Sequence, residues 1–361
     1  MAPPPPPRQA PRKPWHTHLT LDLVVRVVNT TLLSPFIAWM VPLCFRAQAT
    51  PYEWTSMRVS VAYASLVTLL WLLSLLNERV AFGAPREVDL EEEVIVITGG
   101  AGGLGLLIAQ TYGMRGASVA VLDVKENTDT AEARGVKFYK CDVGDREQVE
   151  AAAKRIEKDL GAPTILINNA GIVNGLPLLK LSPEQIEKTF RTNLLSHFYT
   201  IQTFLPGMIR KQGGTIVTVS SVLGYLGCRN LSDYTSSKAA LLALHASLTA
   251  ELSPHHPYIK TLLVTPGQIA TPLFAHVKTP SSFLAPVLEP VDVAARIIAA
   301  VDAGEGGHLA LPFYARWIQL MGVLPVGVQR VVRWMSGVDG AVGGLLVEKE
   351  GGEGRESVAG E

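Results

Sequence analysis

The chain has 361 residues, which is enough for one large α/β domain with appendages or for two ordinary domains. Its 32 Lys and Arg residues balance its 32 Asp and Glu residues, so the net charge does not indicate nucleic acid as a partner. The three cysteines, Cys44, Cys141 and Cys228, are scattered and odd in number, which favours a reducing compartment without a disulfide framework.

The N-terminal part divides into a proline-rich arm and an apolar segment. Residues 1–18 contain a run of prolines and are predicted to be a disordered arm. Residues 19–80 are predicted to anchor the chain in a membrane. Residues 59–76 have no charge and fit one span, although an amphipathic or buried domain helix would also fit. Residues 27–45 contain Pro35 and Pro42, so they fit a second span or a re-entrant or interfacial segment.

After a charged linker, short runs rich in Val, Ile and Leu alternate with helical stretches. The runs predict buried parallel strands at 94–98, 118–122, 136–140, 164–168, 215–219 and 261–265. Helices are predicted at 104–114, 145–160, 183–211, 234–252 and 291–303, the third with a start signal in Ser182, Pro183 and Gln185. This order predicts an α/β fold, a doubly wound parallel sheet of the Rossmann type in a single domain over residues 90–310.

The first predicted strand runs directly into a glycine-rich loop, and a helix follows. Glycines allow the backbone to approach a pyrophosphate, whose charge then lies at the amino end of a helix. A tight turn would explain a glycine-rich loop alone, but the strand and helix around it favour dinucleotide binding. Two registers fit: Gly100-x-Gly102-x-x-Gly105 and Thr98-Gly99-x-x-x-Gly103-x-Gly105.

Asp123 closes the second predicted strand and indicates which dinucleotide binds. A carboxylate there accepts hydrogen bonds from a ribose 2′-hydroxyl and repels a 2′-phosphate. NAD is therefore favoured, while the nearby Lys125 leaves NADP open.

Tyr234 and Lys238 are four residues apart and share one face of a predicted helix. A free phenol has a pKa near ~10, too high for a base at neutral pH. A neighbouring ammonium about 4 Å away favours the phenolate by ~4 kcal/mol at an effective dielectric of about 20. The same spacing occurs on many solvated helix faces, so the pair alone proves nothing.

The motifs taken together resemble those of the classical short-chain dehydrogenases/reductases. They occur in the family's order over residues 93–310: Thr98-Gly99-x-x-x-Gly103-x-Gly105, Asp142-Val143, Asn168-Asn169-Ala170-Gly171, Asn193, Ser221, Tyr234-x-x-x-Lys238 and Pro266-Gly267-x-x-x-Thr271. The resemblance implies the catalytic residues Asn193, Ser221, Tyr234 and Lys238, with Ser220 as a competitor for the serine role. It implies the cofactor-binding residues Thr98, Gly99, Gly103, Leu104, Gly105, Asp123, Asp142, Val143, Asn169, Ala170, Gly171, Tyr234, Lys238, Pro266, Gly267, Ile269 and Thr271.

The resemblance also implies a role for individual cofactor residues. Asp142 would hold the adenine amino group, and Asn169 would line the adenosine side. For one of Asn168 and Asn169, however, we expect hydrogen bonding at the strand end to be the main role. Ile269 and Thr271 would contact the nicotinamide carboxamide.

The implied chemistry is hydride transfer with acid and base catalysis. Tyr234 would take the hydroxyl proton of an alcohol while Ser221 hydrogen-bonds the same oxygen. Lys238 would bind the ribose and, with the positive nicotinamide ring, lower the phenol pKa. Asn193 would support a water-mediated proton path. We expect no metal site, because His255 and His256 have no carboxylate at ligand spacing. His245 is expected to be packed or at the surface, and Cys228 to line the substrate pocket.

The C-terminal third of the chain indicates the substrate and a second membrane contact. Residues 272–290, where the family has its variable lid, are apolar, which favours a hydrophobic substrate. Residues 311–336 combine aromatic residues with isolated arginines and are predicted to be an amphipathic membrane-associated segment, although packing on the sheet or on a dimer partner would also fit. Residues 337–361 are Gly- and Glu-rich and are predicted to be disordered.

This architecture resembles the membrane-anchored retinol dehydrogenase and 17β-hydroxysteroid dehydrogenase branch of the family. The resemblance implies a lipid alcohol or ketone as substrate, such as a retinoid, a steroid or a long-chain alcohol, and a homodimer. It implies the endoplasmic reticulum or a lipid droplet, with the catalytic domain facing the cytosol. An NADPH-dependent ketone or acyl reductase, and an inactive nucleotide-binding membrane scaffold, are the alternatives.

Overall fold

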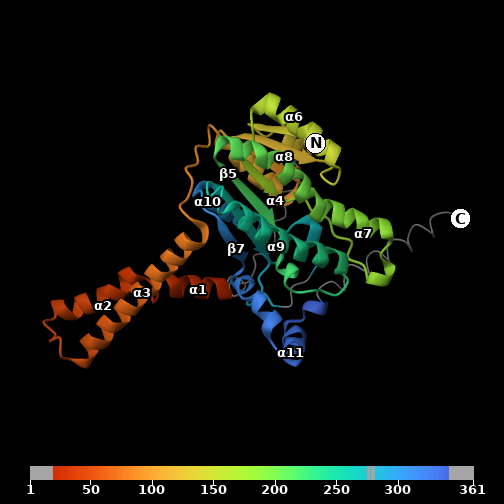
Figure 1. Cartoon of the computed structure of the whole chain (residues 1–361). Coiled ribbons are helices and arrows are strands. Elements are labelled where there is room, and N and C mark those ends of the chain that lie inside the picture. The colour runs from red at the N-terminus through yellow and green to blue at the C-terminus, as the bar shows by residue number, and fades with distance from the viewer. Residues whose placement is uncertain (1–18, 275–276, 278–280, 341–361) are drawn as a thin grey trace, which may run out of the picture. The chain divides into compact units, whose positions relative to one another are not determined.

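The computed structural model describes residues 19–274, 277 and 281–340 (Figure 1). The predicted arm at 1–18 and all but the first four residues of the predicted tail lie outside these ranges. The described chain separates into two compact units. One contains the residues up to Thr68 together with Ser281–Pro286, and the other contains Leu69–Pro280 and the residues from Val287 onward.

The larger unit is built on a seven-stranded parallel sheet of order β3-β2-β1-β4-β5-β6-β7. Its strands are β1 (Val94–Thr98), β2 (Ser118–Asp123), β3 (Val136–Lys140), β4 (Ile165–Asn168), β5 (Gly214–Val219), β6 (Ile259–Pro266) and β7 (Gly307–Leu311). The predicted doubly wound parallel sheet is therefore confirmed. β7 was not among the predicted strands, because its sequence Gly-His-Leu-Ala-Leu lacks the β-branched residues typical of a buried strand.

Helices cover both faces of the sheet, and each face has its own apolar core (Figure 1). α4 (Gly103–Met114) and α10 (Pro290–Asp302) pack on one face. α6 (Arg146–Leu160), α8 (Ser196–Lys211) and α9 (Ser232–Leu252) pack on the other, and the short α5 (Thr128–Ala131) precedes β3. β1, β4, β5 and β6 are buried on both sides, which explains why their sequences are short apolar runs. The outer strands β3 and β7 are partly exposed.

The predicted helix at 183–211 is one helical stretch with an interruption. α7 (Pro183–Phe190) begins with the expected capping box of Ser182 and Gln185. A π-helical turn at Arg191–Leu195 then separates α7 from α8. Such turns often occur at functional sites, and this one contains Asn193.

The strand order determines where a ligand can bind. The chain leaves β1 toward β2 on one side, while β4 pairs on the other side of β1. This reversal opens a crevice at the carboxyl ends of β1 and β4. The candidate residues should therefore lie at this edge of the sheet.

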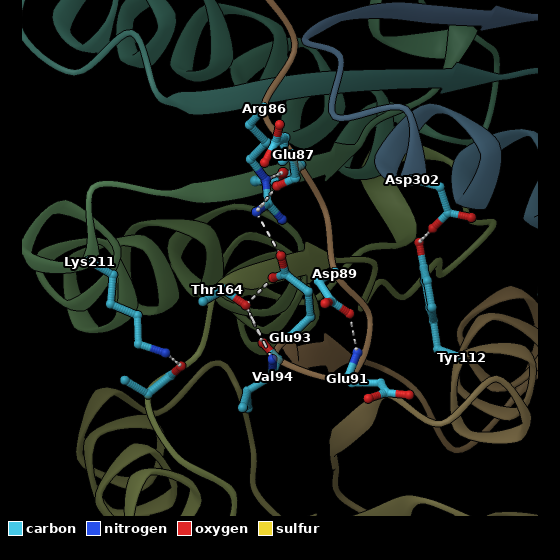
Figure 2. A network of polar contacts seen from close by, with 12 residues as sticks. Arg86, Glu87, Asp89, Glu91, Glu93, Val94, Tyr112, Thr164, Lys211 and Asp302 are labelled. Atoms are coloured by element: carbon cyan, nitrogen blue, oxygen red, sulfur yellow. Dashed lines mark hydrogen bonds and ion pairs between the residues drawn. The ribbon is translucent and has the colours of Figure 1, made fainter.

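The chain enters the sheet at the opposite, amino edge through a buried polar network (Figure 2). Arg86 Nη1 lies 2.7 Å from Glu93 Oε1, and Arg86 Nε donates to Thr215 Oγ1 at 2.9 Å. Glu93 also accepts a hydrogen bond from the Thr164 hydroxyl. The backbone N–H of Arg86 donates to the Gly304 carbonyl at 3.0 Å. These bonds attach the linker before β1 to the amino ends of β4 and β5.

The smaller unit contains α1 (Leu21–Thr30), α2 (Pro35–Ala47) and the first half of α3 (Thr55–Phe82). Trp39 Nε1 donates to Thr68 Oγ1 at 2.9 Å, and Ala38, Ala64 and Val67 are buried together. α3 has 28 residues and is long and apolar enough to cross a membrane. α1 and α2 pass the same test only as a pair, which is bent by 48°. Many large apolar side chains of α2 and α3 are exposed.

Candidate active site

The glycine-rich loop between β1 and α4 has the geometry that only glycine tolerates at several positions. Gly99 and Gly103 have φ angles of 64° and 52°. A Cβ on Gly99 would lie 2.8 Å from Ala170 Cα, and one on Gly105 would lie 2.4 Å from the Gly99 carbonyl oxygen. The positions at which the backbone requires glycine therefore match the register with Gly99, Gly103 and Gly105. Gly100 packs tightly on the side chain of Val121, whereas a Cβ on Gly102 would meet nothing within 4 Å.

Asn168 and Asn169 both make hydrogen bonds at the end of β4, where this role was expected for one of them. Asn169 Nδ2 donates to the carbonyl oxygens of Thr98 and Gly99 at 3.2 and 3.1 Å. Thr98 Oγ1 accepts from the backbone N–H groups of Asn169 and Ala170 at 3.0 and 3.1 Å. Asn168 Oδ1 accepts from Thr200 Oγ1 at 2.8 Å. The Thr98 and Asn169 bonds hold the glycine loop against β4, whereas the Asn168 bond attaches β4 to α8.

The two acidic cofactor candidates lie at the carboxyl ends of β2 and β3. Asp123 Oδ2 accepts from the Ala101 N–H at 3.1 Å, and its Oδ1 accepts from the Val124 N–H at 2.8 Å. The Asp142 side chain is exposed, and its Oδ1 accepts from the Gly144 N–H at 2.9 Å. Asp123 is thus attached to the glycine loop, in the position expected for a group that contacts the cofactor ribose.

The segment after β6 approaches the same crevice. A Cβ on Gly103 would lie 3.5 Å from Thr271 Cγ2, so Thr271 lies against the start of α4. Ile269 pairs with Leu288 in an isolated bridge, and the Gly267 N–H donates to the Leu311 carbonyl at 2.6 Å. Pro266 is the last residue of β6. Three further cofactor candidates are buried in segments that follow β1, β3 and β4: Leu104, Val143 and Ala170.

Tyr234, Ser221 and Lys238 come together at the carboxyl end of β5. Tyr234 lies in the first turn of α9, is 4% exposed and forms a side-chain hydrogen bond with Ser221. Lys238 is one turn further along, with Nζ 5.7 Å from the centre of the Tyr234 ring. Lys238 Nζ donates to the Val219 carbonyl at 2.9 Å. The Ser220 hydroxyl instead donates to the Lys238 carbonyl at 2.9 Å, so Ser221 is the serine beside the phenol.

Asn193 connects the π-helical turn to both the loop after β4 and α9. Its Oδ1 accepts from the Ile172 N–H at 2.8 Å, and its Nδ2 donates to the Ile172 carbonyl at 3.0 Å and to Ser237 Oγ at 3.1 Å. A Cβ on Gly171 would lie 3.6 Å from Asn193 Oδ1 and 3.7 Å from Lys238 Nζ. The side chain is fully buried, so its amide orders this part of the site.

Burial dominates the protonation of the phenol and the amine. It raises the pKa of Tyr234 to about 12, and the hydrogen bond with Ser221 opposes this rise. Burial lowers the pKa of Lys238 to about 8. The lowering of the phenol pKa was expected from Lys238 acting together with the positive nicotinamide ring; in the chain by itself, desolvation of the phenolate keeps the pKa high. At neutral pH, Tyr234 is a proton donor and Lys238 remains mostly charged.

Sequence reasoning missed a buried polar cluster next to Tyr234. Asn174 Nδ2 donates to Asp233 Oδ2 at 2.7 Å and to Thr189 Oγ1 at 2.9 Å. Thr189 Oγ1 lies 3.0 Å from the same carboxylate oxygen, and Asp233 is 4% exposed. The cluster ties the start of α9 to α7 and to the loop after β4. No sequence signal links these three residues, because they are far apart in the chain.

The histidines near the site are buried and do not form a metal centre. Burial and the neighbouring Lys238 hold the pKa of His197 well below its usual range. Burial lowers the pKa of His245 to about 4, so the packed position expected for this residue is the one observed. Among residues 19–274, 277 and 281–340, no group of three His, Cys, Asp or Glu side chains is placed to hold a metal ion.

A nucleotide-binding sheet with a buried phenol and amine at its carboxyl edge indicates a nicotinamide-dependent oxidoreductase. Comparison with known families supports this class, because the family described as short chain dehydrogenase matches residues 93–281. The chain belongs to this family, whose members act on a CH–OH group with NAD or NADP.

Named relatives agree with the family match. Epidermal retinol dehydrogenase 2 of Mus musculus is 36% identical over 252 residues, which cover 67% of this chain and 81% of the relative. Estradiol 17-beta-dehydrogenase 11 of Homo sapiens is 33% identical over 244 residues, covering 65% of this chain and 80% of the relative. Short-chain dehydrogenase/reductase family 16C member 6 of Bos taurus is 31% identical over 278 residues, covering 74% and 88%. The predicted resemblance to the retinol and 17β-hydroxysteroid dehydrogenase branch is confirmed.

A solved structure agrees with the fold. The ligand-free aldohexose dehydrogenase of Thermoplasma acidophilum superposes with a TM-score of 0.54 at 24% identity. The match covers 62% of this chain and 93% of that structure.

Proposed function

We propose that this chain is a membrane-bound oxidoreductase that transfers hydride between NAD and a hydrophobic lipid alcohol or ketone, such as a retinoid, a steroid or a long-chain alcohol. The observation that carries this proposal is the buried Tyr234, hydrogen-bonded to Ser221 and one helical turn from Lys238. We assign catalysis to Asn193, Ser221, Tyr234 and Lys238, and cofactor binding to the residues named for it in the sequence.

The residues at the carboxyl edge fit a nicotinamide dinucleotide. α4 begins at Gly103, and its N-cap residue Gly102 has no side chain to cap the first N–H groups. These groups and the positive end of the helix suit a pyrophosphate. The space beside Gly102 leaves room for close approach, while the positive φ angles at Gly99 and Gly103 shape the loop around it.

Asp123 supports NAD as the preferred cofactor. Its carboxylate is bound to the Ala101 N–H in the glycine loop, so it lies where the adenosine ribose of a dinucleotide would sit. A 2′-phosphate there would place two negative groups close together, which is unfavourable. Lys125, whose backbone N–H also approaches Asp123, is the residue that would support NADP instead.

Tyr234 and Ser221 would perform the proton chemistry on the substrate oxygen. In oxidation, the Tyr234 phenolate takes the hydroxyl proton of the alcohol, and Ser221 Oγ hydrogen-bonds the same oxygen as it becomes a carbonyl. When bound, NAD supplies the acceptor for the hydride that leaves the carbinol carbon. In reduction, the protonated phenol, which is the form at neutral pH in the chain by itself, donates its proton to the carbonyl oxygen.

Lys238 and Asn193 would support this proton transfer. The Val219 carbonyl holds the Lys238 amine in place, where its charge and that of an oxidised nicotinamide would both favour the phenolate. Asn193, held by Ile172 and Ser237, keeps the loop after β4 near Lys238 and would order water between the amine and solvent. Without these groups, burial alone would leave the phenol protonated.

The surroundings of Tyr234 support a hydrophobic substrate. Cys228, Leu231 and Tyr234 form an apolar cluster, and the partly buried Val173, Leu223, Phe274 and Val338 pack against it. Phe274, from the segment where the family has its lid, contacts the phenol ring edge-on at 5.7 Å between ring centres. A lipid alcohol would lose less solvation here than a sugar would. The names of the retinol and estradiol dehydrogenase relatives support the same class.

The N-terminal helices support attachment to a membrane. α3 has the length and composition of a span, and α1 with α2 would form a second, bent span. Two spans would return the chain to the side on which it began, so we propose a catalytic domain on the cytosolic side of the endoplasmic reticulum or a lipid droplet. The domain limits expected from the sequence, and a homodimer, are part of this proposal.

A comparison of cofactors on a substrate panel tests the proposal against an NADPH-dependent reductase and an inactive scaffold. We expect the full chain to turn over at least one retinoid, steroid or long-chain alcohol, with kcat/KM at least about tenfold higher for NAD than for NADP. Asp123→Ala should remove most of this preference because it weakens the binding of NAD. Lys125→Ala should leave the preference for NAD in place. Preference of the unmodified chain for NADP would contradict the cofactor assignment, and no turnover of any substrate would favour the scaffold.

A further inference from the structure

The C-terminal helix α11 (Val326–Ser336) is mounted on the catalytic unit in an unusual orientation. Val328, Val331, Val332 and Met335 follow the i, i+3, i+4, i+7 spacing and form one apolar face. In a soluble domain such a face packs on the core. Here the side chain of Val331 is 54% exposed and that of Met335 is 73% exposed, and no residue of the helix is buried.

Polar side chains of α11 bind one residue of the substrate wall and residues on either side of the helix. Arg333 Nη2 donates to the Gly227 carbonyl at 2.8 Å. The same guanidinium pairs with both carboxylate oxygens of Asp339, at 2.5 and 3.1 Å. Gln329 Nε2 donates to the Leu324 carbonyl at 2.7 Å. Arg333 thus attaches the helix to Gly227, while the apolar face remains exposed.

These attachments join α11 directly to the wall of the Tyr234 site. Gly227 precedes Cys228, whose thiol donates to the Val338 carbonyl at 3.4 Å. Cys228 and Val338 both belong to the apolar cluster around Tyr234. Val338, two residues after the end of α11, thus lies in the apolar cluster around the reacting phenol.

The charges and aromatic residues around this face favour a lipid surface as its partner. No acidic residue occurs between Leu311 and Val338, and Arg316 and Arg330 are exposed. Trp317 and Trp334 are 54% and 82% exposed, and tryptophan prefers the boundary between headgroups and acyl chains. An apolar helix face with arginine and tryptophan beside it has the composition of an interfacial helix. Phosphate headgroups complement its charge.

We propose that the exposed face of α11 docks on an anionic bilayer surface and forms the entrance through which a lipid substrate passes from the membrane to Tyr234. This inference rests on the proposed function for the nature of the substrate. The docking itself does not depend on turnover. Arg333 links the docked helix to Gly227, so contact with the membrane and the position of the substrate wall are coupled.

Two substrates presented differently test the entrance. The full chain is reconstituted in vesicles of phosphatidylcholine and phosphatidylserine, with a long-chain alcohol in the bilayer or a short water-soluble alcohol in the buffer. For the double variant Val331→Glu, Met335→Glu, we expect KM for the bilayer substrate to rise about tenfold or more, because two apolar contacts become charged. Values for the soluble alcohol should stay unchanged. Lys154→Glu, which adds a negative charge on the exposed side of α6, away from α11, should change neither.

Equal losses with both alcohols, or no loss with either, would overturn the proposal. A change in oligomeric state of the double variant in detergent, with normal use of the bilayer substrate, would identify a protein interface and also overturn it. Docking is measured separately by quenching of tryptophan fluorescence with phosphatidylcholine brominated on its acyl chains. Trp334→Phe should remove part of the quenchable signal, and an unchanged signal would contradict docking. If the unmodified chain oxidises neither alcohol but the quenching result holds, the proposed function fails and the docking surface stands.

Discussion

Tyr234→Phe is expected to lower kcat about a thousandfold or more while leaving the fold intact. The substitution removes only the phenolic oxygen, which is the group that exchanges a proton with the substrate, and such proton transfers contribute roughly 10²- to 10⁴-fold. The ring itself remains and keeps its edge-on contact with Phe274. The measurement is the steady-state rate on the best substrate of the panel, with thermal unfolding as the check on folding.

The two adjacent serines provide a matched control for this result. Ser221 hydrogen-bonds the phenol, whereas the Ser220 hydroxyl donates to the Lys238 carbonyl. Ser221→Ala should therefore lower kcat strongly and Ser220→Ala should lower it much less. A Tyr234→Phe enzyme with more than about a tenth of the original kcat would show that another group handles the proton.

Glu93→Leu is expected to destabilise the catalytic unit by about 3–5 kcal/mol, because it leaves the Arg86 guanidinium buried without its partner. Arg86 and Glu93 form this pair (Figure 2). Their side chains are 11% and 7% exposed, and Arg86 Nε also donates to Thr215 Oγ1. The loss is measured from urea unfolding of the full chain in detergent.

Replacing both partners shows whether the stability loss comes from the unpaired charge on Arg86 or from the changed shape of the site. Arg86→Met with Glu93→Leu removes both charges together, so it should cost clearly less than Glu93→Leu alone. Lys137→Met is an exposed comparison, because the Lys137 pair with Asp159 is half solvated and should contribute about 1 kcal/mol or less. Equal losses for the single and double variants would show that the charge on Arg86 is not the cause.

The central strands of the sheet were predictable because their residues are buried on both faces, so their sequences are short apolar runs. β7 was not predicted, because a partly exposed edge strand tolerates residues such as Gly307 and His308, which are uncommon in buried strands. The π-helical turn that interrupts the predicted helix at 183–211 was not predicted either. Propensity along the chain does not show that the Asn193 amide binds the Ile172 backbone across the site.

The candidate site residues that belong to sequence motifs were predictable. Properties that depend on the three-dimensional surroundings of a residue, such as its pKa and its distant partners, were not. The glycine loop, Ser221, Tyr234 and Lys238 are brought together at one edge of the sheet. The raised pKa of Tyr234 was not predictable, because it comes from desolvation by the residues that the fold packs around the phenol. The buried cluster of Asp233 was not predicted either, because the fold alone brings its partners Asn174 and Thr189 next to it.

Transfer of deuterium from substrate to cofactor tests the central proposal most directly. A lipid alcohol from the panel is prepared with deuterium on its carbinol carbon and incubated with the full chain and NAD. We expect the product ketone or aldehyde to form together with reduced NAD that carries the deuterium on its nicotinamide ring, and Tyr234→Phe to form almost none. Absence of label on the cofactor, or equal labelling by Tyr234→Phe, would contradict hydride transfer at this site.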